Sequence, residues 1–77
     1  MRQFHVICKL NGKCKWNVID YFVELGYDCS GECGLENIHH DFWFYEYNKK
    51  NVCVDQYIIE NELRKRLNTM QVWVAEI

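Results

Sequence analysis

Apolar and polar residues alternate near both ends of the chain. Between residues 3 and 10 every second position is apolar, and the positions between them include His5, Ile7 and Lys9. The alternation returns between residues 70 and 75, where Val72 and Val74 flank Trp73. Because successive side chains of a strand point to opposite faces of a sheet, both stretches are predicted to be β-strands.

The centre of the chain is aromatic. Four aromatic residues stand in a row at 42–45, and Glu46 and Tyr47 follow. A helix with this sequence would be aromatic on every side, whereas bulky rings fit the pleated surface of a strand. Residues 48–51 are polar, and an apolar run resumes at 52–54. The pattern predicts a β-hairpin over Phe42–Val54 with aromatic side chains on both faces.

A helix is predicted between the first strand and the centre, from about residue 15 or 17 to Leu25. Asn17 is its candidate N-cap, and Gly26 is placed to end it in the left-handed conformation. Asn11-Gly12 is typical of a hairpin turn, but a hairpin there would set an apolar row beside a polar one, so we expect none. The apolar stripe of this helix is Trp16, Ile19, Phe22 and Val23.

A second helix is predicted from its N-cap Asp55 to Leu67 or Asn68. Ile59, Leu63 and Leu67 form its apolar stripe, and acidic residues early and basic residues late suit the helix dipole. Residues 28–41 have no periodic pattern. A loop of that length in a compact domain is usually functional or contains a short extra element.

The predicted order is therefore β-α-β-β-α-β. Right-handed crossovers fold this order into a four-stranded antiparallel sheet with both helices on one face, which is a ferredoxin-like α+β domain. RNA-recognition motifs have the same plan. We expect residues 1–77 to form a single domain and a complete protein.

Alternation divides the strand residues between the two faces of this sheet. Apolar residues fall under the helices: Phe4, Val6, Cys8, Phe42, Phe44, Val52, Val54, Val72 and Val74. The opposite face is expected to carry rings with a polar group, together with the polar neighbours of the first strand: His5, Ile7, Lys9, Trp43, Tyr45, Tyr47, Cys53 and Trp73. An exposed patch with two tryptophans is larger than a monomer normally shows.

Three interpretations of this second face stay open. Trp and Tyr are enriched in interaction hot spots, which favours a protein interface or a homodimer. Aromatic sheets also stack the bases of single-stranded RNA or DNA, as in RNA-recognition motifs. That family carries its rings on the third strand, which is residues 51–54 in the predicted order and has none. Alternatively, the loop over residues 28–41 folds back and buries the face.

Charge is segregated along the chain although the net charge is only −2. Residues 19–48 contain seven acidic residues and no Lys or Arg, which favours a basic protein partner over a phosphate backbone. The partner-binding residues we predict are His5, Glu32, Glu36, Asp41, Trp43, Tyr45, Glu46, Tyr47 and Trp73.

Five cysteines without a secretory signal or a membrane segment indicate a cytoplasmic protein with reduced thiols. Cys29, Cys33, His39 and His40 are candidate zinc ligands, although the Cys spacing is not that of a zinc knuckle. No motif places a base beside a nucleophile, so we expect neither catalysis nor a required cofactor.

These patterns lead to a functional hypothesis. We expect a small, non-catalytic protein-binding module that masks a basic, nucleic-acid-handling partner through its aromatic sheet face and its acidic segment. In size and charge layout the chain resembles phage-encoded inhibitors of host enzymes, including anti-CRISPR and anti-restriction proteins. A single-stranded nucleic-acid-binding protein and a small zinc-binding regulatory domain are the alternatives.

Overall fold

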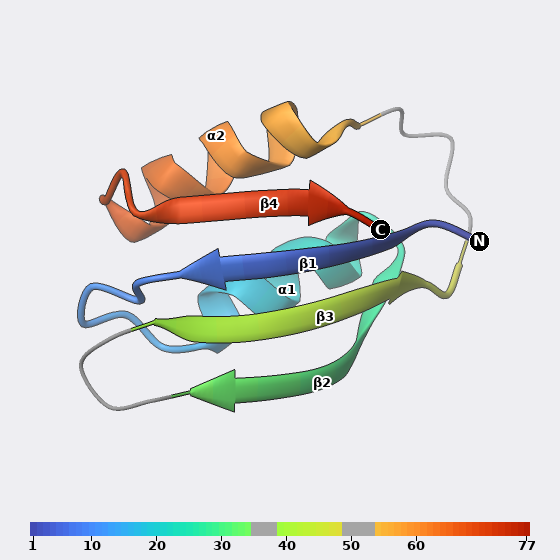
Figure 1. Cartoon of the computed structure of the whole chain (residues 1–77), viewed down its shortest axis with the longest axis horizontal. Coiled ribbons are helices and arrows are strands. Elements are labelled where there is room, and N and C mark those ends of the chain that lie inside the picture. Colours follow the sequence, from blue (N-terminus) through green and yellow to red (C-terminus); the bar gives the residue numbers. More distant parts are fainter. Residues whose placement is uncertain (35–38, 49–53) are drawn as a thin grey trace.

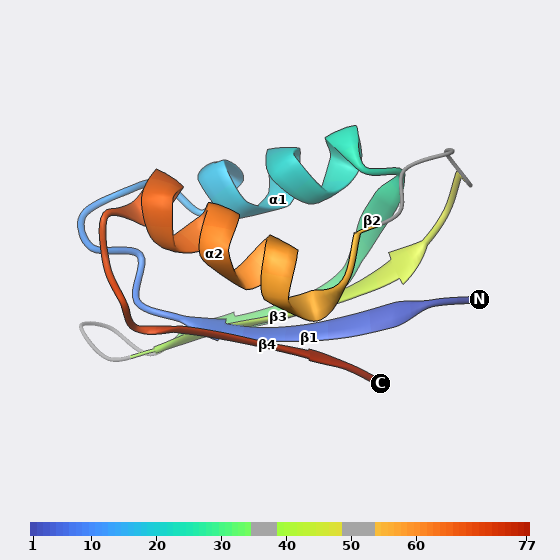
Figure 2. The same ribbon diagram turned by 90° about the horizontal axis from the view of Figure 1, so that it is seen from above.

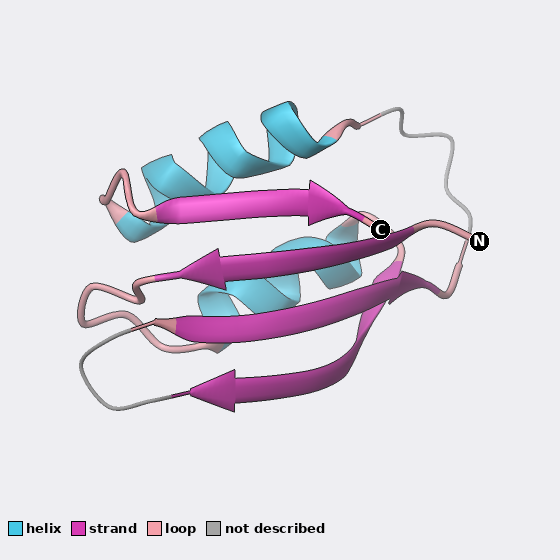
Figure 3. Ribbon diagram, viewed as in Figure 1, coloured by secondary structure: helices cyan, strands magenta, loops and turns pink. Residues whose placement is uncertain are grey.

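Six elements follow one another in the computed structural model, which describes residues 1–34, 39–48 and 54–77 (Figures 1 and 3). The order of strands and helices is the one that the sequence predicts. The elements are β1 (Gln3–Cys8), α1 (Trp16–Glu24), β2 (Tyr27–Gly34), β3 (His40–Glu46), α2 (Gln56–Leu67) and β4 (Val72–Glu76).

The four strands form one sheet in the order β2-β3-β1-β4, and every neighbouring pair is antiparallel. It follows that α1 joins the parallel strands β1 and β2, with β3 lying between them. In the same way α2 joins β3 and β4 across β1. Both helices lie on one side of the sheet, as Figure 2 shows. The α+β architecture with a two-layer arrangement is therefore confirmed.

The positions of the second and third strands differ from the prediction. The hairpin is formed by β2 and β3, so the segment 28–41, predicted as a loop, supplies a whole strand and the start of the next. The predicted strand at 52–54 falls largely outside the described residues, and Val54 lies outside the strands. β2 has no apolar alternation because it is an edge strand, with an irregularity between Cys29 and Gly31, and most of its side chains are exposed.

The core lies between the sheet and the helices, and the predicted parity of β1, β3 and β4 is confirmed. Phe22 of α1 stacks on Phe44 of β3 with ring centroids 3.8 Å apart. Val54 packs against this core at its edge. The buried residues are Phe4, Val6 and Cys8 of β1, Phe42 and Phe44 of β3, Val72 and Val74 of β4, Val18, Ile19, Tyr21 and Phe22 of α1, Tyr27 of β2, and Ile59, Leu63 and Leu67 of α2.

Helix α1 is rotated relative to the predicted stripe. Trp16 and Val23 are about half exposed, because the buried arc is centred on Val18 and Phe22 instead. Asn17 is not the N-cap: it lies inside the helix, and its side-chain amide donates to the carbonyl of Cys14. The predicted end is confirmed, since Gly26 has a φ of +92°.

Helix α2 has the predicted cap and stripe. The Asp55 carboxylate accepts hydrogen bonds from the amides of Tyr57 and Ile58, both at 2.9 Å. Asn11, whose φ is positive like that of Gly12, turns the chain without forming a hairpin, as expected. Its side-chain amide donates to the carbonyls of Leu67 and Asn68, which ties this turn to the end of α2.

Side chains of α2 also cover the outer edge of β4. Gln56 accepts from the amide of Glu76, and Glu60 accepts from the amide of Val74, each at 3.0 Å. Arg64 donates to the carbonyl of Val72 at 2.9 Å. Residues one turn apart on α2 thus form hydrogen bonds with every second residue of β4. These bonds occupy backbone groups that an edge strand would otherwise offer to another chain.

Candidate functional site

The side of the sheet opposite the helices is the candidate site, and we call it the open face. No described element lies over it (Figure 2). The interpretation in which residues 28–41 fold back over this face is wrong for 28–34 and 40–41, because these residues belong to the sheet. The ring of His39 does contact Trp73 of this face, and residues 35–38 lie outside the described residues. By strand register the open face consists of Gln3, His5, Ile7, Asp28, Gly31, Cys33, Asp41, Trp43, Tyr45, Trp73 and Ala75.

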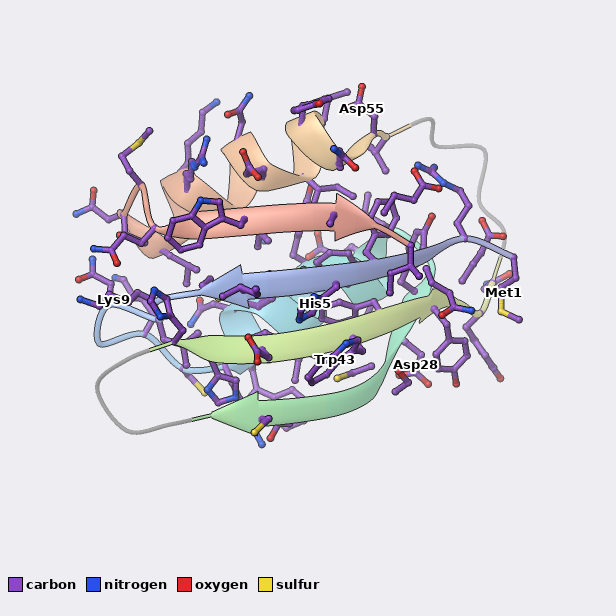
Figure 4. All side chains as sticks on the ribbon, viewed as in Figure 1. Met1, His5, Lys9, Asp28, Trp43 and Asp55 are labelled. Carbon is purple, nitrogen blue, oxygen red and sulfur yellow. The ribbon has the colours of Figure 1, made fainter. Side chains whose placement is uncertain are left out.

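The centre of the open face is a ring pair between two small residues. The register places Gly31, Trp43, His5 and Ala75 side by side across the four strands. The imidazole of His5 and the indole of Trp43 are stacked, with centroids 4.8 Å apart and planes within 7° of parallel. Figure 4 shows the two labelled side chains next to each other on the side facing the viewer. Gly31 and Ala75 leave space at either end of this stack.

A second row across the sheet consists of Cys33, Asp41, Ile7 and Trp73. Trp73 remains 48% exposed, although the ring of His39 meets it edge-on at 5.6 Å. Asp41 Oδ1 lies 4.0 Å from Nε2 of His5. This row therefore sets a large exposed ring and a carboxylate on the same surface, which is typical of interaction sites rather than of a monomer's outer surface.

Asp28 and Tyr45 form the third row with Gln3. The Tyr45 hydroxyl donates to Asp28 Oδ2 at 3.4 Å, and the amide of Cys29 donates to Asp28 Oδ1 at 3.0 Å. Desolvation, followed by the charge of Asp28, raises the pKa of Tyr45. Tyr45 therefore stays a hydrogen-bond donor, and the Asp28 carboxylate is held in a defined orientation.

The two carboxylates of the open face differ from five glutamates of the described residues in their ion pairing. Within residues 1–34, 39–48 and 54–77, neither Asp28 nor Asp41 forms an ion pair with a Lys or Arg. Ion pairs with basic residues are formed instead by Glu24, Glu32, Glu60, Glu62 and Glu76. The negative charge available to a partner on this face thus comes from the two aspartates.

Several residues predicted for the partner site do not lie on the open face. Glu32 pairs with Phe42 on the helix side and forms an ion pair with Lys15 at 2.6 Å. Glu46 lies opposite buried Tyr27, so its parity is also that of the helix side. Tyr47 follows the end of β3 and borders a separate shallow hollow of about 330 Å³. Glu36 is outside the described residues. His5, Asp41, Trp43, Tyr45 and Trp73 do share the face.

The four candidate zinc ligands are not brought together. Cys29 pairs with Phe44 on the helix side, whereas Cys33 pairs with Asp41 on the open face. The ring of His40 stacks on Phe42, 4.7 Å between centroids. Nε2 of each of the three histidines is buried without a hydrogen-bond partner among the described atoms. No cluster of three or more potential ligands occurs in the part of the chain that the structure describes.

The thiols with altered acidity are the partly or fully buried ones. Burial, and secondarily the charge of Asp41, raises the pKa of Cys8 from 9.0 to about 12. Burial is also the main cause that raises the pKa of Cys29. Because the thiolate is the reactive form, neither thiol is activated as a nucleophile at neutral pH.

The sequence did not single out Asp28, Gly31 or Ala75 as site residues. Asp28 and Gly31 lie in a stretch without alternation, so their membership of a strand had no signal in the pattern. Ala75 follows the alternation of the last strand, and this spacing alone could have placed it beside His5.

Comparisons of the chain with family models, curated proteins and solved structures gave no match. None of the helices in the described part of the chain has the length and apolar character that crossing a membrane requires.

Proposed function

We propose that this chain is a non-catalytic protein-binding module that covers a surface of its partner with the open face. The observation that carries the proposal is Trp73, a large ring that is 48% exposed on a sheet face with no described element over it. Trp43, Tyr45 and Ile7 extend the same surface. A few residues, with tryptophan and tyrosine prominent among them, supply most of the free energy of association in protein complexes.

The partner surface is basic under this proposal. Asp28 and Asp41 have no Lys or Arg partner among the described residues, and a complex that pairs them gains specificity and a faster association rate. Basic surfaces are typical of proteins that handle nucleic acid. We therefore propose that the module acts as an inhibitor that masks such a surface, in the manner of small phage-encoded inhibitors.

We further propose that the fold is ferredoxin-like. Read from the edge strand β4, the sheet order is β4-β1-β3-β2. Each helix then connects two parallel strands that are separated by one strand of the other β-α-β unit. This interleaving is the split β-α-β arrangement of the ferredoxin-like plan, which supports the assignment.

A second candidate function is binding of single-stranded nucleic acid. Three rings of the open face, those of His5, Trp43 and Tyr45, stand on β1 and β3, the two central strands, and RNA-recognition motifs stack bases on these strands. The sequence pattern placed the third strand at residues 51–54, which contain no ring, and this counted against the function. The third strand is β3, which carries Trp43 and Tyr45, so that prediction was wrong. Asp28 and Asp41 oppose it, since they stand on the same face and repel phosphates.

Capture of the partner from extracts of the native host tests the proposed function. Trp73→Ala removes the exposed ring of the open face, and we expect it to reduce capture at least tenfold, the effect of a hot spot worth more than about 1.4 kcal/mol. Trp16→Ala is the matched control, because Trp16 is 52% exposed on α1, on the other side of the molecule.

The two variants must keep the wild-type melting temperature for the comparison to hold. Equal capture by wild type and Trp73→Ala, or equal losses in both variants, would rule out the open face as the binding surface. Loss of capture after nuclease treatment of the extract would instead favour the nucleic-acid function.

A further inference from the structure

The Trp43 indole lies between His5 and Gly31 on the open face. His5 stacks on one face of the indole, with ring centroids 4.8 Å apart. On the other side lies Gly31 of β2. Among the described residues other than its chain neighbours, a Cβ atom added to Gly31 would meet one atom within 4 Å, Cε3 of Trp43 at 3.9 Å. The missing side chain therefore leaves a slot whose wall is the indole and whose floor is the backbone of β2.

Two carboxylates share the face on which this slot lies. Asp28 precedes Gly31 on β2. Asp41 precedes Trp43 by two residues on β3, and its Oδ1 lies 4.0 Å from Nε2 of His5. Hydrogen bonds from Tyr45 and from the amide of Cys29 fix the Asp28 carboxylate. Neither aspartate is neutralised by Lys or Arg within the described ranges. A flat, apolar wall with unneutralised negative charge beside it suits a planar cation.

The molecule itself combines arginine, an aromatic ring and a carboxylate twice. The guanidinium of Arg66 lies 4.6 Å from the ring centroid of Tyr21, and Arg66 pairs with Glu62 at 3.2 Å. Arg2 lies 5.0 Å from the ring of Phe4 and pairs with Glu76 at 2.9 Å. The slot at Gly31 has the ring and the carboxylates of this arrangement.

We propose that the slot beside Trp43 and Gly31 binds an arginine side chain of the partner protein. The guanidinium stacks on the indole, and Asp28 and Asp41 match its charge. This inference rests on the proposed protein-binding function and names the side chain that the open face recognises. Arginine is favoured over lysine because its planar, weakly hydrated guanidinium stacks on rings and pairs with carboxylates at the same time. A nucleobase also stacks, but its phosphates meet the aspartates.

The test is an NMR titration of the whole chain that follows the indole signal of Trp43. Hexa-arginine, hexa-lysine and octathymidylate are the three probes. We expect hexa-arginine to shift the Trp43 signal and to bind about tenfold more tightly than hexa-lysine, which has the same charge but cannot stack as a plane.

Two substitutions test the slot. Gly31→Val fills it on the Trp43 side, and Trp16→Ala is the control, because Trp16 is an exposed indole on α1, outside the open face. Gly31 lies in a strand and does not have a left-handed φ, so valine suits this position. We expect Gly31→Val to weaken hexa-arginine binding about tenfold, and Trp16→Ala to leave it within about twofold.

Equal affinities of wild type for the two peptides would overturn the proposal, and this comparison does not depend on the variants. Unchanged arginine binding by folded Gly31→Val would also overturn it, as would a shift of Trp43 by octathymidylate alone. Each of these results leaves the loss of partner capture in Trp73→Ala unaffected, so the failure of the arginine slot is distinguishable from failure of the proposed function.

Discussion

Small residues decide what the rings of the open face can contact. His5 and Trp43 fill the middle of their row, whereas Gly31 and Ala75 at its ends leave the outer sides of the stack uncovered. Larger side chains at the two ends would close the row into a continuous surface. Two small side chains beside two rings in one row thus leave the rings accessible for stacking.

The buried thiol of Cys8 is expected to contribute to a loss of stability at high pH. Cys8 has a pKa of about 12 in the folded chain against an ordinary 9.0. Between these values the unfolded chain releases the Cys8 proton and the folded chain keeps it. The free energy of unfolding must therefore fall as the pH rises, by about 1.4 kcal/mol per pH unit from this group.

Cys8→Ala should flatten this fall, whatever its cost to stability at neutral pH. Urea denaturation between pH 9 and pH 12 measures the slope for wild type and variant. Cys14→Ala, which removes an exposed thiol, is the matched control and should keep the wild-type slope. A Cys8→Ala slope equal to that of wild type would contradict the burial of Cys8.

At the scale of elements, α2 acts both as a cover for the core and as a cap for the edge of β4. Its apolar stripe of Ile59, Leu63 and Leu67 faces inward. A neighbouring stripe of Gln56, Glu60 and Arg64 bonds the backbone of β4. The edge is thereby closed to strand addition, which leaves the open face as the part of the β4 side that a partner can use.

Glu60 is the member of this stripe that a substitution can test. Glu60→Ala leaves the amide of Val74 without its acceptor and Arg64 without its ion-pair partner. We expect a loss of about 1–3 kcal/mol in the free energy of unfolding, measured by urea denaturation. Glu60→Gln keeps an acceptor oxygen and should recover at least half of that loss. Equal losses in the two variants would count against the bond to Val74.

The sequence predicted those elements whose signals are local. Asp55 and the spacing of Ile59, Leu63 and Leu67 define α2 without reference to the rest of the chain. The strand β2 has no such signal, because pairing with β3 holds a sequence with two glycines and few apolar residues in the sheet. Propensity is overridden there by long-range pairing.

At the scale of the whole molecule, the topology gathers the candidate site. β1 and β3 are far apart in sequence but adjacent at the centre of the sheet, which stacks His5 on Trp43. Alternation predicted that these two residues share a face. Asp28 and Gly31 belong to the site because β2 pairs with β3. That pairing is seen in the folded chain and could not be predicted from the alternation.

The same topology explains why the acidic segment is not one surface. Residues 19–48 run through α1, β2 and β3, and the strands among them present alternate residues to opposite sides. Glu32 is therefore turned toward Lys15, and Asp41 toward the open face. Acidic residues that are neighbours in sequence form one acidic surface only when their side chains point to the same side of the fold.

A partner protein that covers the open face must shield Trp73 from solvent. Hydroxyl-radical footprinting of the captured complex measures this shielding directly, because Trp73 and Trp16 are about equally exposed in the free chain and stand on different sides of the molecule. We expect oxidation of Trp73 to fall severalfold in the complex while oxidation of Trp16 is unchanged. Unchanged oxidation of Trp73, or protection of Trp16 alone, would contradict this expectation.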